Sequence, residues 1–230
     1  MRTIAIIPCK RTSERLPSKN MMRVGGQTLV ERAAFVASGL DLVVLASDAE
    51  AIIEQGIRQA ERQQTRAVGF PLDEQLAGKR AHLEDVISEV IRRHPADRYV
   101  LLQPTSPLRK RRHVHSALAI LSKTGCDSVI SVHEVTKDVY FSGTIDRDGR
   151  WASGRPKGVR LFTSQLPKLV AENGAVYAWT HDCWSKHRDR SGGDCRAMEM
   201  DVDDAIDIDT PAELERAQRR FSWVDDRHET

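Results

Sequence analysis

Short apolar segments alternate along this chain with segments that begin with helix-start signals, and this alternation limits the possible folds most. Ile4–Ile7 and Leu42–Leu45 are continuous apolar runs, as in strands that are buried on both faces of a parallel sheet. Each run is followed by the spacing of a capping box, at Thr28–Glu31 and at Ser47–Glu50. Strands and helices in alternation indicate a mainly parallel sheet with helices on both faces.

The same alternation continues toward the carboxyl end of the chain, with one interruption. Between about residues 135 and 170 the sequence has turn signals and little periodicity, so we expect an excursion from the sheet there. The other expected elements are helices at Leu83–Arg93, Lys110–Lys123 and Pro211–Phe221, and strands at Tyr99–Leu102, Asp127–Val132 and Ala175–Trp179. We therefore predict a single domain over residues 1–230 with a three-layer α/β/α fold.

The composition is typical of a soluble globular protein. Of 230 residues, 40% are hydrophobic and 30% are charged, and the formal net charge is only +2. A nucleic-acid-binding module needs a basic face with interleaved aromatic residues, and the near-neutral charge and 5% aromatic content argue against one. The sequence has no run of roughly 18 apolar residues for a membrane span, and its first apolar run is too short for a signal peptide.

The cysteines are widely spaced, and no two of them form a C-x-x-C pair: they are Cys9, Cys126, Cys183 and Cys195. This usage predicts free thiols and a reducing cytoplasm rather than a disulfide framework. The last two cysteines lie near His181 and His187, so four metal-ligand types occur close together. Their spacing matches no zinc signature, and we expect buried cysteines and surface histidines there.

Two aspartates near the end of the chain are candidate metal ligands. Asp207 and Asp209 alternate with isoleucines, so in an extended strand both carboxylates lie on one face, roughly 7 Å apart. Thr210, Pro211 and Glu213 then have the pattern of a helix start, which fixes the pair at a strand-to-helix corner. The alternative is a solvated acidic turn, but this fixed corner favours a site for Mg²⁺, held by carboxylates and substrate phosphates.

A basic loop follows the first expected strand. Lys10, Arg11, Arg15 and Lys19 lie at the carboxyl end of that strand, where open α/β sheets bind ligands. The loop is neither a Walker A motif nor a Rossmann fingerprint, because no glycine precedes Gly25. A solvated basic loop is the alternative when the loop is taken alone. Together with the acidic pair, the loop favours Mg²⁺-dependent chemistry on a nucleoside triphosphate.

Five motifs in order resemble the acylneuraminate cytidylyltransferases, also called CMP-sialic acid synthetases. They are IIPCKRTSERLPSKN at residues 6–20, LLQPTSPLR at 101–109, DSVISV at 127–132, NGAVY at 173–177 and IDIDTP at 206–211. The resemblance covers nearly the whole chain. It implies a nucleotidyltransferase of the glycosyltransferase-A-like type that forms a homodimer through the excursion at about residues 135–170.

The resemblance also implies roles for individual residues. Those expected from it to bind the nucleotide are Lys10, Ser13, Arg15, Lys19 and Asn20, and to these we add Arg11 from the basic loop and His82 from the region where the family reads the base. Gln103 would bind the acceptor or face the ribose, Tyr177 would line the acceptor pocket, and Asp207 with Asp209 would bind Mg²⁺. The implied reaction moves CMP from CTP to a sialic-acid-like sugar acid and releases pyrophosphate, with Lys10, Lys19 and Asp209 as its catalytic residues.

The chain departs from the family pattern at three places. The family has Arg-Gly-Gly where Lys10–Thr12 stands, polar base-reading residues near His82–Leu83, and Arg-Gln-Asp at Thr163–Gln165. The acceptor could therefore be a 3-deoxy-octulosonate, a sugar phosphate or a phosphonate, and the nucleotide could be another triphosphate. A nucleotide-binding protein without catalysis is a further alternative, which the retention of Asp207 and Asp209 disfavours.

Overall fold

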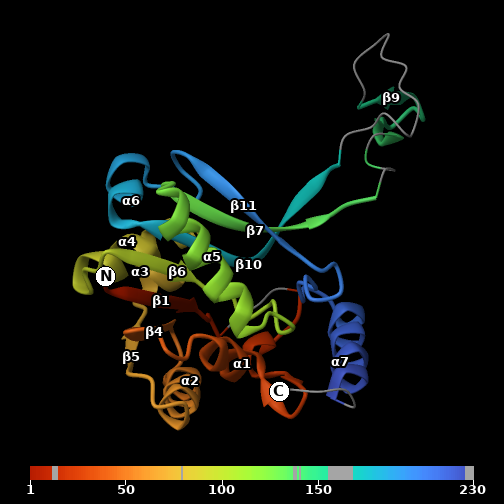
Figure 1. Cartoon of the computed structure of the whole chain (residues 1–230). Helices are drawn as coiled ribbons and strands as arrows, with labels where there is room; N and C mark the ends of the chain where they lie inside the picture. Colours follow the sequence, from red (N-terminus) through yellow and green to blue (C-terminus); the bar gives the residue numbers. More distant parts are fainter. Residues whose placement is uncertain (12–14, 79, 137–138, 140, 155–167, 226–230) are drawn as a thin grey trace.

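A seven-stranded sheet forms the centre of the protein in its computed structural model (Figure 1). The structure describes residues 1–11, 15–78, 80–136, 139, 141–154 and 168–225, with side chains up to residue 221. The strand order is β11-β7-β10-β6-β1-β4-β5. The strands are β1 (Thr3–Pro8), β4 (Leu42–Ser47), β5 (Ala67–Pro71), β6 (Arg98–Leu101), β7 (Ser128–Glu134), β10 (Val170–Thr180) and β11 (Cys195–Met200).

The sheet is mainly parallel, as the sequence predicts. β1 pairs in parallel with β4 and β6, β4 with β5, and β11 with β7. Only β10 runs antiparallel to its neighbours β6 and β7 among the described strands of this sheet. The carboxyl ends of β1, β4 and β6 therefore meet at one edge of the sheet, where the loops that follow them come together.

Helices cover both faces of the sheet, which confirms the three-layer architecture. The helices are α1 (Leu29–Val36), α2 (Glu50–Arg62), α3 (Glu74–Ala77), α4 (Leu83–Arg93), α5 (Arg111–Thr124), α6 (His181–His187) and α7 (Pro211–Asp225). Buried residues of α1, α2 and α5 pack with Ala5 and Ile7 of β1. Buried residues of α4 and α6 pack with Ile4 and Ile6 on the opposite face. The alternation of side chains along β1 thus divides the core into two layers.

The first predicted capping box is confirmed, whereas the second is absent although the helix predicted after it forms. Thr28 caps α1: its Oγ1 accepts a hydrogen bond from the Glu31 N–H, and its own N–H donates to the Glu31 carboxylate at 2.7 Å. At the second signal the Ser47 hydroxyl instead donates to the Cys9 carbonyl at 2.6 Å, and α2 begins at Glu50 without a side-chain cap. Ser47 therefore links the ends of β4 and β1.

A short helix and a small hairpin follow the basic loop. The 3₁₀ helix η1 spans Lys19–Met21, and β2 (Arg23–Val24) pairs with β3 (Gln27–Thr28). These segments pack with α7 around a third apolar cluster that includes Leu16, Leu29 and Ile208. The cluster joins the amino-terminal loop to the carboxyl-terminal helix, which lie at opposite ends of the sequence.

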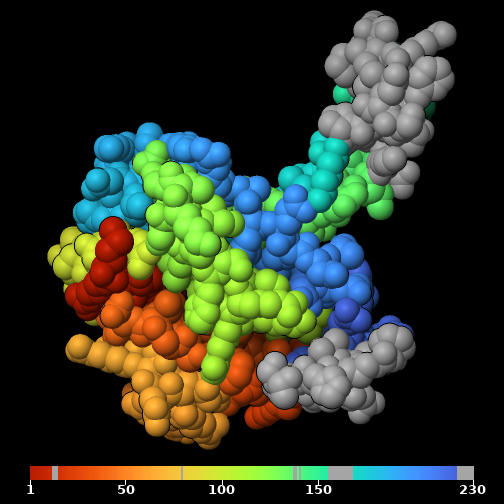
Figure 2. Space-filling view, in the orientation of Figure 1, coloured from red at the N-terminus to blue at the C-terminus, as the bar shows by residue number. Residues whose placement is uncertain are grey.

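The excursion is an arm that projects from the sheet. β7 and β10 extend beyond the other strands, and a hairpin of β8 (Gly143–Ile145) and β9 (Trp151–Ser153) lies at the far end of the arm (Figure 1). In the space-filling view the green and teal residues at the base of the arm project from the body (Figure 2). Among the described residues of the arm, the exposed large apolar side chains include Val139, Phe141, Ile145 and Trp151. Thr163–Gln165, where the chain departs from the family pattern, lies outside the described residues.

The cysteines are free, as predicted. Cys9, Cys126 and Cys183 are buried, Cys195 is half-buried, and the nearby His181 and His187 are exposed. Within the described residues, no three His, Cys, Asp or Glu side chains are grouped to hold a metal ion. Likewise, none of the helices described is long and apolar enough to cross a membrane.

Candidate active site

A pocket of about 320 Å³ opens at the carboxyl ends of β1 and β6. It lies where ligands bind in open α/β sheets. Four of the residues expected at the site line it together: Lys10, Lys19, Asn20 and Gln103. The pocket therefore brings together the basic loop after β1 and the loop after β6. The rest of its lining is Pro8, Leu72, Ala81, Leu83, Val86, Pro104 and Thr105.

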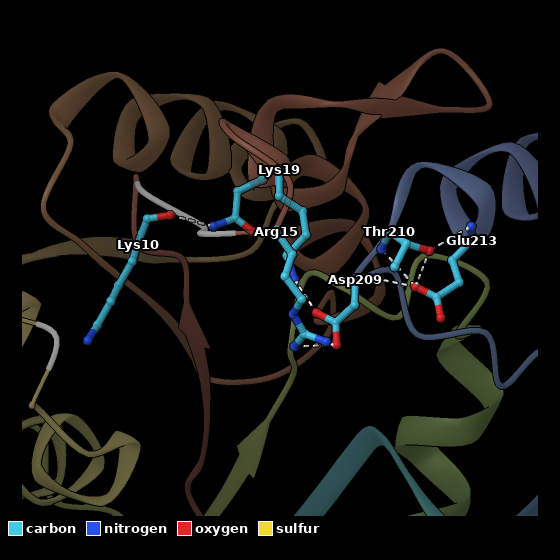
Figure 3. Close-up of polar contacts among 7 residues, drawn as sticks. Lys10, Arg15, Lys19, Asp209, Thr210 and Glu213 are labelled. Carbon is cyan, nitrogen blue, oxygen red and sulfur yellow. Dashed lines mark hydrogen bonds and ion pairs between the residues drawn. The ribbon is translucent and has the colours of Figure 1, made fainter.

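The basic loop is held in place by its own polar contacts. The Asn20 amide donates to the Lys10 carbonyl at 2.8 Å, and the Arg11 N–H donates to the Asp48 carboxylate at 2.6 Å. The Lys10 ammonium reaches the Gly78 carbonyl at 3.4 Å, and its side chain points away from Asp209 (Figure 3). The Arg11 side chain is exposed, and Ser13 lies outside the described residues.

Asp209 is the centre of a charged cluster that joins the two ends of the chain. The Lys19 ammonium lies 2.9 Å from one carboxylate oxygen and the Arg15 guanidinium 2.7 Å from the other (Figure 3). Partial burial opposes ionisation of Asp209, but the hydrogen bond and charge of Lys19, helped by Arg15, keep its pKa below the ordinary value. Asp209 is therefore a carboxylate at neutral pH.

Asp207 has the opposite electrostatic setting. Although the residue as a whole is exposed, protein atoms around its carboxyl desolvate it, and the nearby charge of Asp209 adds to the effect. Both raise the pKa of Asp207 above its ordinary value, and a hydrogen bond from Thr105 only partly offsets them. A cation shared by the two carboxylates would relieve this repulsion. With substrate phosphates as further ligands, the pair fits the few-carboxylate sites that Mg²⁺ uses.

The two aspartates do not lie on a strand, and that part of the prediction is wrong. The Ile208 N–H donates to the Thr105 carbonyl at 2.8 Å, so the segment is tied to the loop after β6 and not to the sheet. The predicted alternation is present, because Ile206 and Ile208 are buried in the apolar cluster beneath α7. Packing in this cluster, and not a β-ladder, turns both carboxylates toward the pocket loops.

The predicted helix start after the aspartates is confirmed. The Thr210 Oγ1 accepts from the Glu213 N–H at 3.3 Å, and the Glu213 carboxylate accepts from the Thr210 N–H at 2.8 Å. The same carboxylate also accepts from the Asp209 N–H at 2.8 Å (Figure 3). The capping box thus fixes the backbone of Asp209 as well as the first turn of α7.

Gln103 lies against an irregular part of β10. Gly174 has a φ of +73°, and a Cβ at this position would lie 3.5 Å from the Gln103 Nε2. Between Glu172 and Tyr177 the pairing of β10 with β7 shifts its register. The Asn173 and Ser131 side chains accept the N–H groups of Ala175 and Val176 in this stretch, at 3.1 and 2.7 Å. The irregular stretch therefore allows close approach to Gln103 without leaving these donors unpaired.

Arg109 holds the two sides of this wall together, a role that the sequence analysis did not assign. Its side chain is buried, and one guanidinium nitrogen donates to the carbonyls of Gln103 and Ala175 at 3.0 and 2.6 Å. Burial, with a smaller contribution from the Arg32 charge, lowers the pKa of Arg109 to about 9. Its place in the quoted motif LLQPTSPLR was the only available signal, because a buried arginine has no periodic pattern.

Tyr177 lies one strand away from the pocket and is enclosed by charged groups. It faces Leu101 across the β10–β6 pairing, two positions before Gln103. Its hydroxyl donates to the Glu172 carboxylate, and burial followed by this contact raises the pKa of Tyr177 to about 12. The Arg190 guanidinium covers its ring, with Cζ 4.5 Å from the ring centroid. Arg190 was also not identified from the sequence.

His82 lies at the rim of the pocket. It is the exposed residue before α4, and its N–H donates to the Asp85 carboxylate at 3.1 Å. Its neighbours Ala81 and Leu83 line the pocket, so His82 is near the expected base-binding region. The backbone of His82 is held by the start of α4.

A second cluster anchors the segment that carries the aspartates. The buried Asp204 carboxylate lies 3.0 Å from the Lys110 ammonium, 3.1 Å from the Arg112 guanidinium and 3.7 Å from the His113 imidazole. These three residues surround the start of α5. The cluster therefore joins the loop before Asp207 to the loop that contains Gln103.

Comparisons with known proteins agree with this architecture. The CMP:2-keto-3-deoxy-manno-octonic acid synthetase, solved in complex with CTP, superimposes with a TM-score of 0.69 at 18% identity, over 97% of this chain and 99% of that chain. A solved 4-diphosphocytidyl-2C-methyl-D-erythritol synthase from Anaerococcus prevotii gives a TM-score of 0.65 at 15% identity, over 96% of each chain. Both likenesses support the predicted nucleotidyltransferase fold.

Sequence comparisons identify the family. The N-acylneuraminate cytidylyltransferase of Streptococcus agalactiae serotype V is 28% identical over 91% of this chain, which spans about half (51%) of that relative's length. The CMP-N,N'-diacetyllegionaminic acid synthase of Legionella pneumophila is 25% identical over 92% of each chain. The model of the family described as Cytidylyltransferase matches residues 4–142, more than half of the chain. The protein belongs to the cytidylyltransferase family.

Proposed function

We propose that this protein transfers CMP from CTP to a sialic-acid-like sugar acid and releases pyrophosphate. The relatives that match most of this chain are named for such transfers to N-acylneuraminate and to diacetyllegionaminic acid. The pocket supplies the groups that the reaction needs: cations for phosphate, amide side chains for hydroxyl groups, and carboxylates at its edge. Other acceptors, such as a 3-deoxy-octulosonate, are the main alternative.

One juxtaposition carries this proposal: Lys19 lines the pocket and at the same time contacts Asp209. A cation that points into the pocket and a carboxylate pair beside it are what phosphoryl transfer requires, because the reaction depends on positioning and charge neutralisation. The two groups lie at opposite ends of the sequence. The fold that brings them together also places them at the edge of the pocket.

The position of each residue in or beside the pocket indicates its role in the proposed reaction. Lys10 and Lys19 would bind the triphosphate and stabilise the charge that develops on the leaving pyrophosphate. Asn20 and Gln103 would orient the ribose and the acceptor, so that the acceptor oxygen attacks the α-phosphate. Asp207 and Asp209 would hold Mg²⁺, which as a Lewis acid neutralises phosphate charge when it is bound.

The decisive experiment is an assay of pyrophosphate release. The protein is incubated with each of the four nucleoside triphosphates, with Mg²⁺ or EDTA, and with a panel of 2-keto sugar acids. We expect release that requires CTP, Mg²⁺ and an acid together. Release with a sugar phosphate or a phosphonate would mean that the acceptor belongs to that class and is not a sugar acid. CTP binding without turnover of any acceptor would mean that the protein binds nucleotides but is not an enzyme.

We further propose that the protein forms a homodimer through its arm and acts in the cytoplasm. Monomeric proteins seldom present several large apolar side chains on a projecting element, and such surfaces mark interfaces. The arm has exposed Phe141, Ile145 and Trp151, with Trp151 60% exposed. The free cysteines fit the reducing conditions of the cytoplasm.

A further inference from the structure

Arg190 lies between α6 and β11 and extends over β10. Its guanidinium lies over the Tyr177 ring and forms an ion pair with Glu84 in the first turn of α4. The Arg190 side chain is only 21% exposed. A strand and a helix from separate parts of the chain therefore meet at the guanidinium of this loop residue.

This cluster lies on the flank of the pocket that contains Gln103. Tyr177 faces Leu101, and β6 leads directly from there to Gln103 in the pocket lining. On the other side, Glu84 follows Leu83, which also lines the pocket. Arg190 thus links β10, the strand beside β6, to the first turn of α4, which contributes Leu83 to the pocket lining.

The guanidinium of Arg190 has donors that these contacts do not use. An arginine side chain has five N–H donors. Nη1 contacts the Glu84 carboxylate, and the guanidinium also hydrogen-bonds to the Tyr177 side chain, whereas the buried Nε has no hydrogen-bond partner among the described residues. A buried donor without a partner costs free energy, so its presence calls for a ligand or a bound water.

Tyr177, in contrast, has no free group to offer a ligand on this side. Its ring face is covered by Arg190, and its hydroxyl donates to Glu172. An apolar acyl group cannot stack on a ring face that a guanidinium already covers. Oxygen atoms of hydroxyl or carboxylate groups, however, are good acceptors for the unused guanidinium donors.

We propose that Arg190 is a specificity-determining residue of the acceptor pocket and selects a hydroxyl group over an acylamino group where the acceptor faces Tyr177. This inference rests on the proposed function, because it assumes that the acceptor binds next to Gln103. It narrows the acceptor class from sialic-acid-like acids in general to those with a hydroxyl group at that position.

The test compares two acceptors and four proteins. The acceptors are N-acetylneuraminate and the matched nonulosonate that has a hydroxyl group in place of the acylamino group. The proteins are the wild type, Arg190→Met, Arg190→Lys, and Arg188→Met as the control at an exposed arginine of the same segment. Kinetics at saturating CTP give kcat and KM for each acceptor, and calorimetry gives acceptor binding in the presence of CTP and without turnover.

We expect the wild type to prefer the hydroxyl acceptor at least tenfold in kcat/KM. Arg190→Met should raise the KM for that acceptor at least tenfold, with kcat, the KM for CTP and the KM for N-acetylneuraminate changed less than threefold. Arg190→Lys, which keeps the charge, should recover part of the loss. Arg188→Met should behave as the wild type.

Three results would overturn the assignment of Arg190. They are a wild-type preference for N-acetylneuraminate, an equal loss for both acceptors in Arg190→Met, and a raised KM for CTP in that variant. If the wild type released no pyrophosphate with any acid, the proposed function would be wrong, and calorimetry would then decide the assignment alone. Weaker binding of the hydroxyl acceptor to Arg190→Met than to the wild type would support the assignment of Arg190. Equal binding to the two proteins, or binding to neither of them, would refute this assignment.

Discussion

The Lys19 ammonium and the Asp209 carboxylate, 190 positions apart in sequence, lie 2.9 Å from each other at the edge of the pocket. Arg15 contacts the other oxygen of the same carboxylate. A triphosphate that binds Lys19 or Arg15 therefore competes with Asp209 for these cations. Binding of the triphosphate to these cations would thus free the Asp209 carboxylate from its ion pairs.

Replacing the lysines of the pocket should weaken CTP binding. A hydrogen bond to a charged group contributes about 1.5–3 kcal/mol, so Lys10→Ala and Lys19→Ala should each raise the Kd for CTP roughly tenfold or more. Acceptor affinity in a preformed CTP complex should change little. Calorimetry measures both, with Lys123→Ala as the control at the exposed end of α5. Unchanged CTP affinity in both pocket variants would mean that the basic loop is solvated surface.

Removing the charge of the aspartate pair should abolish metal-dependent turnover while the fold is retained. Asp209→Asn should lower kcat by about 10² or more, because charge stabilisation at the reacting phosphate is lost. Asp182→Asn, at an exposed position in the first turn of α6, is the matched control. Binding of Mn²⁺, followed by electron paramagnetic resonance, should weaken in the Asp207/Asp209 double variant. Near-wild-type turnover in that double variant would refute the metal assignment.

Nucleobase selection should depend on the rim residue His82. A site that hydrogen-bonds a base edge rejects the wrong base, since its polar groups would be left unpaired. We therefore expect CTP to be preferred and His82→Ala to narrow the ratio of kcat/KM for CTP over UTP. His115→Ala, at an exposed position of α5, should leave the ratio unchanged. Turnover of a purine triphosphate without turnover of CTP would contradict this prediction.

His113 should make the protein less stable in acid. Its Nδ1 accepts the Lys110 N–H at 3.1 Å, and burial lowers the pKa of His113 from 6.5 to about 4, more than the Asp204 charge raises it. Between these two pH values the unfolded chain takes up a proton that the folded protein does not. The free energy of unfolding should therefore fall as the pH falls from 6.5 to 4, by up to about 3 kcal/mol from this group.

Urea denaturation at a series of pH values measures this effect. His113→Asn keeps an acceptor for the Lys110 N–H but cannot titrate, so its stability should decline less between pH 6.5 and 4. His187→Asn, at an exposed position, should follow the wild type. Parallel pH profiles for the wild type and His113→Asn would show that His113 is protonated in the folded state as it is in the unfolded chain.

A charge at the end of the arm should prevent dimerisation. Trp151 is 60% exposed on β9, and Trp151→Glu would place a carboxylate in the proposed apolar interface. We expect the wild type to sediment as a dimer and the variant as a monomer at micromolar concentration. Arg150→Glu, at the neighbouring exposed position, controls for a general effect of negative charge. A monomeric wild type would contradict the proposed interface.

The sequence predicts the central strands better than the edge strands. β1 and β4 are continuous apolar runs because both of their faces are buried, and these runs were identified. β5 and β11 lie at the two edges of the sheet and were not predicted. AVGFP has a central glycine and a terminal proline, and CRAMEM has exposed polar residues, so neither segment has a strong apolar pattern.

The residues of the candidate site likewise fall into two groups: those that the sequence identifies and those that only the structure shows. The basic loop and the aspartate pair could be found because each is a local run of charge in the sequence. The contacts of Arg190 with Tyr177 and Glu84 could not, because they join a strand, a helix and a loop and the ion pair spans 106 positions. Asp204 was missed for the same reason, since its partners Lys110 and Arg112 are brought to it only by the folded loops.

The register shift in β10 lies between the arm and the candidate site. Val170–Glu172 belong to the root of the arm, whereas Tyr177 belongs to the wall of the site, and one continuous backbone joins them. Asn173 and Ser131 lock the joint between these two stretches. In the proposed homodimer, a partner subunit that binds the arm would therefore contact the same strand that lies beside Gln103.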